Sequence, residues 1–160
     1  MSRLDSFIAR LQAQRTILNH VRYDMALPAE GAVLEIGLGN GRTYDHIREI
    51  FTHRRIIAFD RAVGSHPRST PDQRDLVLGE ISETLTSMAG MGAAFAHADI
   101  GTAYPEVDSE TKRWLPPALA DALASGGVVA SGLPLTHADL APLPVPEGID
   151  PERYYLYRRR

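Results

Sequence analysis

The segment from Val33 to Gly41 constrains the fold of this chain more than any other. It reads Val-Leu-Glu-Ile-Gly-Leu-Gly-Asn-Gly, a short run suited to a buried strand followed by three alternating glycines. Glycine permits backbone dihedrals that other residues avoid, and it leaves the space of a side chain free. A strand that ends in such a loop and leads into a helix forms a hollow where a nucleoside-bearing cofactor can lie against peptide groups. The segment therefore predicts a cofactor-binding α/β fold.

The spacing of the glycines separates the cofactor classes that use such loops. A Walker loop needs a lysine followed by Ser or Thr six residues after its first glycine, and neither Gly37 nor Gly39 has that pair. The dinucleotide fingerprint G-x-G-x-x-G needs a small third residue, where the helix packs closely on the strand. Arg42 occupies that position. A nicotinamide dinucleotide is therefore disfavoured, although an NAD(P)-dependent oxidoreductase stays open as a weaker alternative.

Length and charge limit the class of protein. At 160 residues the chain suits a single domain with its own core. We divide it into an N-terminal amphipathic helix over residues 1–24 and a cofactor-binding α/β core over residues 32–160. The formal net charge of −3 provides no basic face for nucleic acid. The one basic run, residues 158–160, is expected to be a solvated, frayed tail.

Several features are absent from the sequence, and each absence excludes a kind of chemistry or a location. It contains no cysteine, which excludes disulfides, thiolate nucleophiles and cysteine-bound zinc. Its six histidines do not fall into a ligand spacing, so we expect no metal. The first ten residues are charged and amphipathic, unlike a secretory leader, and no apolar run approaches the roughly 20 residues that span a bilayer. We therefore expect a cytoplasmic protein that binds no membrane.

Helix-like and strand-like segments alternate along the chain. Periodicity predicts helices over residues 2–22, 43–52, 82–89 and 108–124, and strands over residues 32–36, 56–60, 76–78, 93–98, 128–131 and 153–158. Pro116 and Pro117 are expected to break the last helix, and the last strand is expected at a sheet edge. The proline-rich stretch 132–151 gives no assignment. The alternation predicts a doubly wound, mostly parallel sheet with helices on both faces.

The first helix has a recognisable start and a patterned face. Ser2 and Asp5 occupy the positions of a capping box. Apolar residues at helical spacing predict one buried stripe, formed by Leu4, Phe7, Ile8, Leu11, Leu18 and Val21.

Four acidic residues lie in or just after expected strands, namely Glu35, Asp60, Glu80 and Asp99. Ligands of open α/β sheets bind outside the carboxyl ends of the strands, so these side chains are candidates for one site. A carboxylate at Asp60 has the acceptor capacity for both hydroxyls of a ribose. Simpler roles stay open: a solvated loop for Asp60, a helix N-terminus for Glu80 and a turn for Asp99.

The motif E-x-G-x-G-x-G, from Glu35 to Gly41, resembles the first motif of the Rossmann-like S-adenosylmethionine-dependent methyltransferases. Nearly the whole chain is similar to a small bacterial subfamily of these proteins that lacks an assigned substrate. The resemblance implies that Glu35 lies near the amino-acid end of the cofactor, Asp60 on its ribose and Glu80 near its adenine. It implies a cofactor site made by Glu35, Gly37, Leu38, Gly39, Asn40, Gly41, Arg42, Thr43, Asp60, Arg61, Gly79, Glu80, Ile81 and Asp99.

The chain departs from typical members of that family in two ways. The connection between the second and third strands, residues 61–74, has little helix, and the carboxyl end is too short for the usual antiparallel pair with a preceding helix. Both departures concern the substrate pocket more than the cofactor pocket. A chain with so little material to close an acceptor pocket is expected to form a homo-oligomer whose partner surface completes the site.

These observations predict methyl transfer from S-adenosylmethionine to a small-molecule acceptor. The reaction is an in-line displacement, so the protein mainly has to hold the reactants collinear and exclude water. If the acceptor arrives protonated, Asp99 and His97 are the candidate bases. A buried structural role is the alternative for His97. A cofactor-binding sensor or regulatory module without catalysis stays open as the alternative function.

Overall fold

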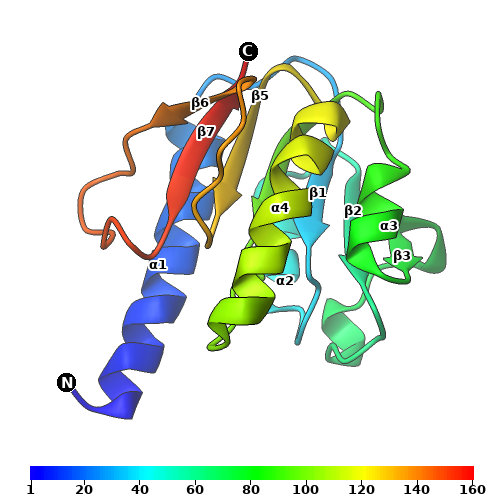
Figure 1. Ribbon diagram of the computed structural model, residues 1–160. Coiled ribbons are helices and arrows are strands. Elements are labelled where there is room, and N and C mark those ends of the chain that lie inside the picture. Colours follow the sequence, from blue (N-terminus) through cyan, green and yellow to red (C-terminus); the bar gives the residue numbers. More distant parts are fainter.

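The computed structural model describes residues 1–160, which form a seven-stranded sheet between pairs of helices (Figure 1). The helices are α1 (Arg3–Asp24), α2 (Arg42–Ile50), α3 (Ile81–Thr86) and α4 (Pro105–Ala122). The strands are β1 (Val33–Ile36), β2 (Ile56–Asp60), β3 (Leu76–Leu78), β4 (Ala93–Ala98), β5 (Leu123–Ser131), β6 (Leu140–Leu143) and β7 (Tyr155–Arg159). None of the helices has both the length and the hydropathy needed to cross a membrane.

The strand order in the sheet is β3-β2-β1-β4-β5-β7-β6. The first five strands in that order pair in parallel, and β7 pairs antiparallel with β5 on one side and β6 on the other. This topology confirms the predicted doubly wound, mostly parallel sheet. In this strand order β1 and β4 are neighbours near the centre of the sheet. The residues that follow their carboxyl ends therefore lie close together.

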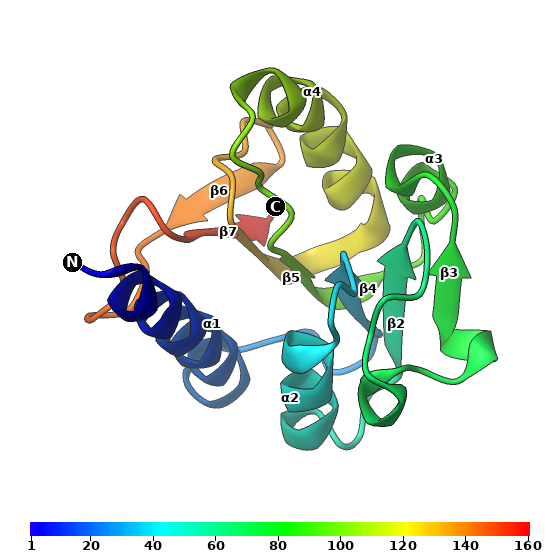
Figure 2. The ribbon, with the colours of Figure 1, turned by 90° about the horizontal axis from the view of Figure 1, so that it is seen from below.

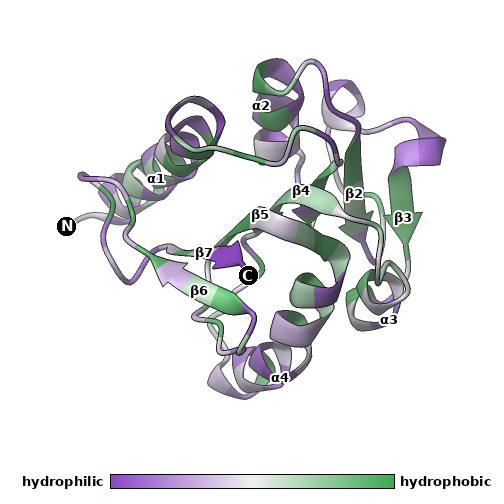
Figure 3. Cartoon of the chain, turned by 90° about the horizontal axis from the view of Figure 1, so that it is seen from above, coloured by the Kyte–Doolittle hydropathy of each residue, from purple (hydrophilic) through white to green (hydrophobic).

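Helices cover both faces of the sheet, as predicted. Seen along the sheet, α1 and α2 lie on one side and α3 and α4 on the other (Figure 2). The central strands β1 and β4 are buried at every residue because they are covered on both faces. Coloured by hydropathy, strands such as β2 and β3 are mainly hydrophobic, whereas the helices carry hydrophilic patches (Figure 3).

Helix α1 begins with the predicted capping box, in which Ser2 and Asp5 bond to each other's backbone amides. Its predicted buried stripe is only half correct. Leu18 and Val21 are buried, but Leu4, Phe7 and Ile8 are exposed by 66%, 44% and 43%. The reason is that the first turns of α1 extend past the carboxyl ends of the parallel strands, where the rest of the molecule covers them only in part (Figure 1).

The predicted break in the last long helix is wrong, because α4 runs through Pro116 and Pro117. A proline in a helix removes a hydrogen bond to the carbonyl four residues earlier. Those carbonyls belong to Lys112 and Arg113, which are exposed, so water can replace the lost donors. Pro116 itself is buried with Leu115 on the side of the helix that faces the sheet.

The carboxyl-terminal part of the chain differs most from the prediction. The last strand, β7, is internal; the edge belongs to β6, which lies in the unassigned proline-rich stretch and contains Pro142. The antiparallel pair therefore does form, although no helix precedes β6. The expected frayed tail is also wrong, since the final arginines bond to backbone oxygens of Ala26, Gly126, Ala120 and Ala138.

Smaller differences concern element boundaries. Helix α2 begins at Arg42 after Gly41, whose left-handed backbone precedes the first turn, rather than at a Thr43 cap. Helix α3 ends at Thr86, before the predicted end at residue 89. Strand β5 begins at Leu123, five residues before the predicted start at residue 128, so the final residues assigned to the last helix are strand.

Candidate functional site

A hollow of about 230 Å³ lies at the carboxyl ends of β1 and β4. The glycine loop forms its floor, the side chains of α1 form one wall, and His97 and Asp99 lie at the end of β4. The ring of Phe7 in α1 lies 5.6 Å from the Arg42 guanidinium in α2, so the two helices meet beside this opening. Its lining comprises Phe7, Arg10, Leu11, Gln14, Gly37, Leu38, Gly39, Asn40, Arg42, Thr43, His97 and Asp99.

The three glycines of the loop are needed for different reasons. All have positive φ, at 88°, 54° and 86° for Gly37, Gly39 and Gly41. A Cβ at Gly37 would collide with Ile100, and one at Gly41 would collide with the backbone of Ser69. A Cβ at Gly39 would meet no atom within 4 Å. The first and third glycines therefore allow close packing of the protein on itself, whereas the open side of Gly39 faces the space where a ligand can lie.

Asp60 lines a second hollow, next to the first. Its Oδ2 accepts a hydrogen bond of 2.8 Å from the Gly39 amide, and its Oδ1 accepts one of 2.7 Å from the Arg61 amide. These bonds hold the carboxylate at the rim and leave each oxygen with further acceptor capacity. The second hollow, of about 800 Å³, is lined by Gly39, Asp60, Arg61, Ala62, Val63, Gly64, Gly79 and Glu80. Gly39 borders both hollows.

The structure brings most of the predicted cofactor residues together around the two hollows. The three that line neither hollow are Glu35, Gly41 and Ile81. Glu80 lies in the second hollow and forms an exposed ion pair of 3.1 Å with Arg61. Ile81 begins α3 and borders a neighbouring pocket instead. Glu35 is 1% exposed and lines neither hollow. It lies beneath the loop, where its oxygens accept hydrogen bonds from Thr43 Oγ1 at 2.7 Å and His97 Nδ1 at 2.6 Å.

His97 connects this buried carboxylate to the carboxyl-terminal part of the chain. Its Nε2 lies 2.9 Å from the hydroxyl of Tyr154, which in turn lies 3.2 Å from Asp99 Oδ2. Asp99 also accepts two hydrogen bonds from the Arg153 guanidinium, at 3.1 and 2.6 Å, and one of 2.8 Å from Gln14 Nε2. Every buried side-chain polar atom has a partner.

These contacts shift the protonation equilibria of the site. Burial lowers the pKa of His97, but the charge and hydrogen bond of Glu35 and the charge of Asp99 outweigh it, so the pKa is raised above its ordinary value. Burial raises the pKa of Asp99, but the hydrogen bonds and charge of Arg153 and the bond from Gln14 lower it to about 2. Burial, aided by the charge of Asp99, raises the pKa of Tyr154 far above its usual range.

Sequence reasoning missed Gln14, Arg153 and Tyr154. Gln14 is an ordinary polar residue of an amphipathic helix, and the two others belong to a segment predicted only as an edge strand. Their position follows from the pairing of β7 with β5, which brings the residues before β7 next to the end of β4. That long-range pairing has no local sequence signal.

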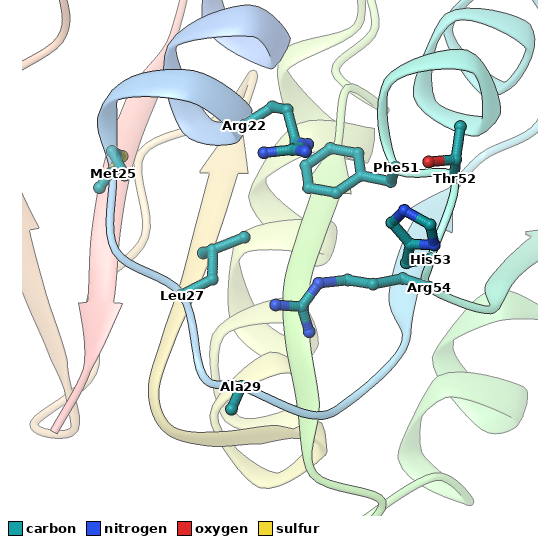
Figure 4. Close-up of a pocket in the computed structure, with 8 residues that line it drawn as sticks. All are labelled: Arg22, Met25, Leu27, Ala29, Phe51, Thr52, His53 and Arg54. Carbon is teal, nitrogen blue, oxygen red and sulfur yellow. The ribbon is translucent and has the colours of Figure 1, made fainter.

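A third hollow, of about 300 Å³, lies at the opposite end of the sheet (Figure 4). Its walls come from the end of α1, the segment before β1 and the residues between α2 and β2. The side chains that give it positive charge already bond to backbone oxygens, Arg22 to Ile50 and Arg54 to Pro28 and Gly31. It lies at the amino ends of the strands, away from the edge where open α/β sheets bind ligands.

Comparison with known proteins agrees with this geometry. Residues 1–159 match a family model described as S-adenosyl-L-methionine methyltransferase. The crystal structure of an S-adenosyl-L-methionine methyl transferase from Silicibacter pomeroyi DSS-3 is 39% identical, covers 100% of this chain and 99% of its own, and superimposes with a TM-score of 0.87. A search of curated protein sequences gives no match.

More distant solved structures share the fold. The 1,6-didemethyltoxoflavin-N1-methyltransferase of Burkholderia thailandensis, crystallised with S-adenosylhomocysteine, is 17% identical, with a TM-score of 0.57 over 94% of this chain and 78% of that one. A fibrillarin/Nop5p complex is 13% identical, with a TM-score of 0.61 over 92% and 83%. With the glycine loop, the strand order and the match over the full length, this chain belongs to the S-adenosyl-L-methionine methyltransferase family.

Proposed function

We propose that this methyltransferase acts on a small molecule, with the cofactor lying across the two hollows that meet at Gly39. The observation that carries the proposal is the open side of Gly39, where a side chain would enter the space that both hollows share. The cofactor brings a methyl group already activated by its sulfonium. The contribution of the chain is to bind it, orient it and exclude water from the methyl group.

In the proposed arrangement Asp60 binds the ribose and Glu80 lies toward the adenine. The methionine end occupies the smaller hollow, where charges of both signs are available for its ammonium and carboxylate groups. Asp99 Oδ1 accepts a hydrogen bond from Arg153 alone, so it has capacity for the ammonium. Arg10 and Arg42 line the same hollow and are the candidates for the carboxylate. Glu35 then supports the loop from below instead of touching the cofactor.

Three observations support a small acceptor over nucleic acid. The formal net charge of −3 lacks the basic footprint that phosphate binding requires. The smaller hollow, at about 230 Å³, is partly closed by α1. The Burkholderia thailandensis relative was crystallised with a small-molecule acceptor, 1,6-didemethyltoxoflavin, so the fold accommodates such substrates.

The test uses S-adenosylmethionine with a labelled methyl group and bacterial extract separated by size. We expect label to enter the low-mass fraction, and D60A, which removes the ribose carboxylate, to abolish the transfer. Label that enters only the RNA or protein fraction would contradict a small-molecule acceptor. Mass spectrometry of the labelled compound then identifies it.

We also propose that the enzyme is a homo-oligomer whose second copy covers the first turns of α1. Leu4, Phe7 and Ile8 form an exposed apolar face there, and Phe7 also lines the smaller hollow. A face of this kind beside a binding site is typical of a surface that a partner covers.

A further inference from the structure

Four side chains form a continuous buried polar chain behind the smaller hollow. Glu35 lies in β1, His97 in β4, Tyr154 just before β7 and Asp99 just after β4. The three links measure 2.6 Å from Glu35 Oε1 to His97 Nδ1, 2.9 Å from His97 Nε2 to the Tyr154 hydroxyl and 3.2 Å from that hydroxyl to Asp99 Oδ2. Glu35 and His97 are 1% exposed and Tyr154 is fully buried.

Counting hydrogens shows what this arrangement requires. Both ends of the buried polar chain are carboxylates, which only accept hydrogen bonds when ionised. Three links between them need three hydrogens. A neutral imidazole supplies one and the Tyr154 hydroxyl supplies one, so a third proton must be present. Arg153 holds Asp99 ionised through two hydrogen bonds, so the extra proton belongs to the pair formed by His97 and Glu35.

We infer that His97 is a doubly protonated positioning residue, which donates to Glu35 and to Tyr154 and so turns the Tyr154 hydroxyl hydrogen toward Asp99. The inference rests on the proposed placement of the cofactor ammonium beside Asp99. Both ring nitrogens of His97 are engaged, by Glu35 and Tyr154, so His97 has no nitrogen free to bond the cofactor. Its effect passes through Tyr154, because Tyr154 can donate its single hydrogen to Asp99 only while His97 Nε2 carries one of its own.

The charges around the imidazole are consistent with this state. The groups that face it are Glu35 from β1, Asp99 beyond β4, and Tyr154 and Arg153 from the turn before β7. The two negative carboxylates stabilise a positive imidazole more than the single guanidinium destabilises it. Arg153 is also paired with Asp99 through two hydrogen bonds, which reduces its effect on His97. Within the pair of His97 and Glu35 the imidazole is the stronger base, with an ordinary pKa of about 6.5 against about 4.3 for a glutamate, so the extra proton belongs to His97. The raised pKa of His97 agrees with this assignment.

This assignment has a consequence for the acceptor. A His97 with both nitrogens protonated cannot take a proton, and Asp99, with its pKa lowered to about 2, is a weak base. No other residue that lines the smaller hollow is a base of ordinary strength, since the remaining charged ones are Arg10 and Arg42. No residue of this hollow can therefore remove a proton from the acceptor. The acceptor atom must already be nucleophilic when it binds, as an unprotonated ring nitrogen or a thiolate is.

The protonation state can be read directly by nitrogen NMR of the histidine side chains in the wild-type protein. At about pH 8, above the ordinary histidine pKa of about 6.5, we expect both His97 nitrogens to show the shifts of an imidazolium. The variant H97Q assigns the signal. If H97Q does not fold, the other five histidines are substituted one at a time. Each substitution removes one signal, and the signal that none of them removes belongs to His97. An unprotonated nitrogen on His97 at this pH would overturn the inference.

The positioning role is tested by calorimetric titration with S-adenosylhomocysteine. We expect H97Q and Y154F each to weaken binding about tenfold, and the double variant to weaken it no further, because both act through one link to Asp99. The matched control is Y157F, which loses a buried hydroxyl bonded to the Leu135 amide at 2.8 Å, away from the site. It should bind like the wild type.

The outcomes separate the two proposals. If the wild type binds and the two substitutions have no effect, or have effects that multiply to about a hundredfold, His97 does not act through Tyr154. If the wild type itself does not bind S-adenosylhomocysteine, the placement of the cofactor fails and the positioning role fails with it. The NMR experiment still decides the protonation state in that case, because it needs no ligand.

Discussion

The carboxylate of Asp99 accepts hydrogen bonds from two separate parts of the chain. Gln14 comes from α1, Arg153 and Tyr154 come from the turn before β7, and Asp99 itself follows β4. Only 10% of the Asp99 side chain and 23% of that of Arg153 is exposed, so their ion pair is only weakly screened by solvent. One side chain therefore joins the first helix, the centre of the sheet and the antiparallel strands.

At the residue scale, D99N is expected to lower the free energy of unfolding by about 2 kcal/mol at neutral pH. The pKa of Asp99 is lowered from 3.8 to about 2 in the folded protein, so its stabilising effect is present above 3.8 and is lost as the pH falls through about 2. Urea unfolding of both proteins at several pH values measures this. A difference that stays constant down to pH 2 would contradict the assigned ion pair.

At the element scale, the glycine loop gives a test that separates binding from folding. G39A places a Cβ in the shared hollow and imposes a left-handed alanine, which costs about 1 kcal/mol of stability. Gly90 also has positive φ, 81°, and no atom within 4 Å of an added Cβ, but it lies outside both hollows. We expect G39A and G90A to lose similar stability, measured by thermal unfolding.

The two variants should differ in binding of S-adenosylhomocysteine. G39A is expected to weaken it at least tenfold and G90A to leave it unchanged, in calorimetric titrations under the same conditions. Equal binding by both variants would mean that the open side of Gly39 does not face the cofactor.

The elements that could be predicted from sequence are those with a local signal. The buried runs of β1, β2 and β4 and the capping box of α1 follow from residue pattern and were placed nearly correctly. Errors occurred where a long-range contact decides the outcome. Pro116 and Pro117 stay helical because α4 packs against the sheet, and the first turns of α1 are exposed because little packs there.

The residues of the candidate site likewise fall into those with a local sequence signal and those placed by long-range contacts. The part that lines the two hollows between Gly37 and Asp60 comes from the loop after β1 and the end of β2, which the glycine motif and a carboxylate at a strand end mark in the sequence. The second part, Arg153 and Tyr154, reaches the site only because β7 inserts between β5 and β6. Glu35 was expected at the amino-acid end of the cofactor, but it is buried under the loop and lines neither hollow. Its partner there is His97 of the neighbouring strand, a contact across 62 residues of sequence.

At the scale of the whole molecule, the uncovered face of α1 predicts self-association. We expect the wild type to sediment as an oligomer at assay concentrations, and L4E combined with I8E to sediment as a monomer with normal thermal stability, because these side chains make up the exposed face. The control Y23S changes another exposed residue of α1, near its other end, and should leave the oligomer intact. A monomeric wild type would contradict the proposed covering of the site.

The most direct test of the account is a crystal structure with S-adenosylhomocysteine bound. We expect its ribose on the carboxylate of Asp60, its amino-acid end between Gly37 and Asp99, and Glu35 still bonded to His97 beneath the loop. Density for the ligand at any other place, or a cofactor that contacts neither Gly39 nor Asp60, would contradict it.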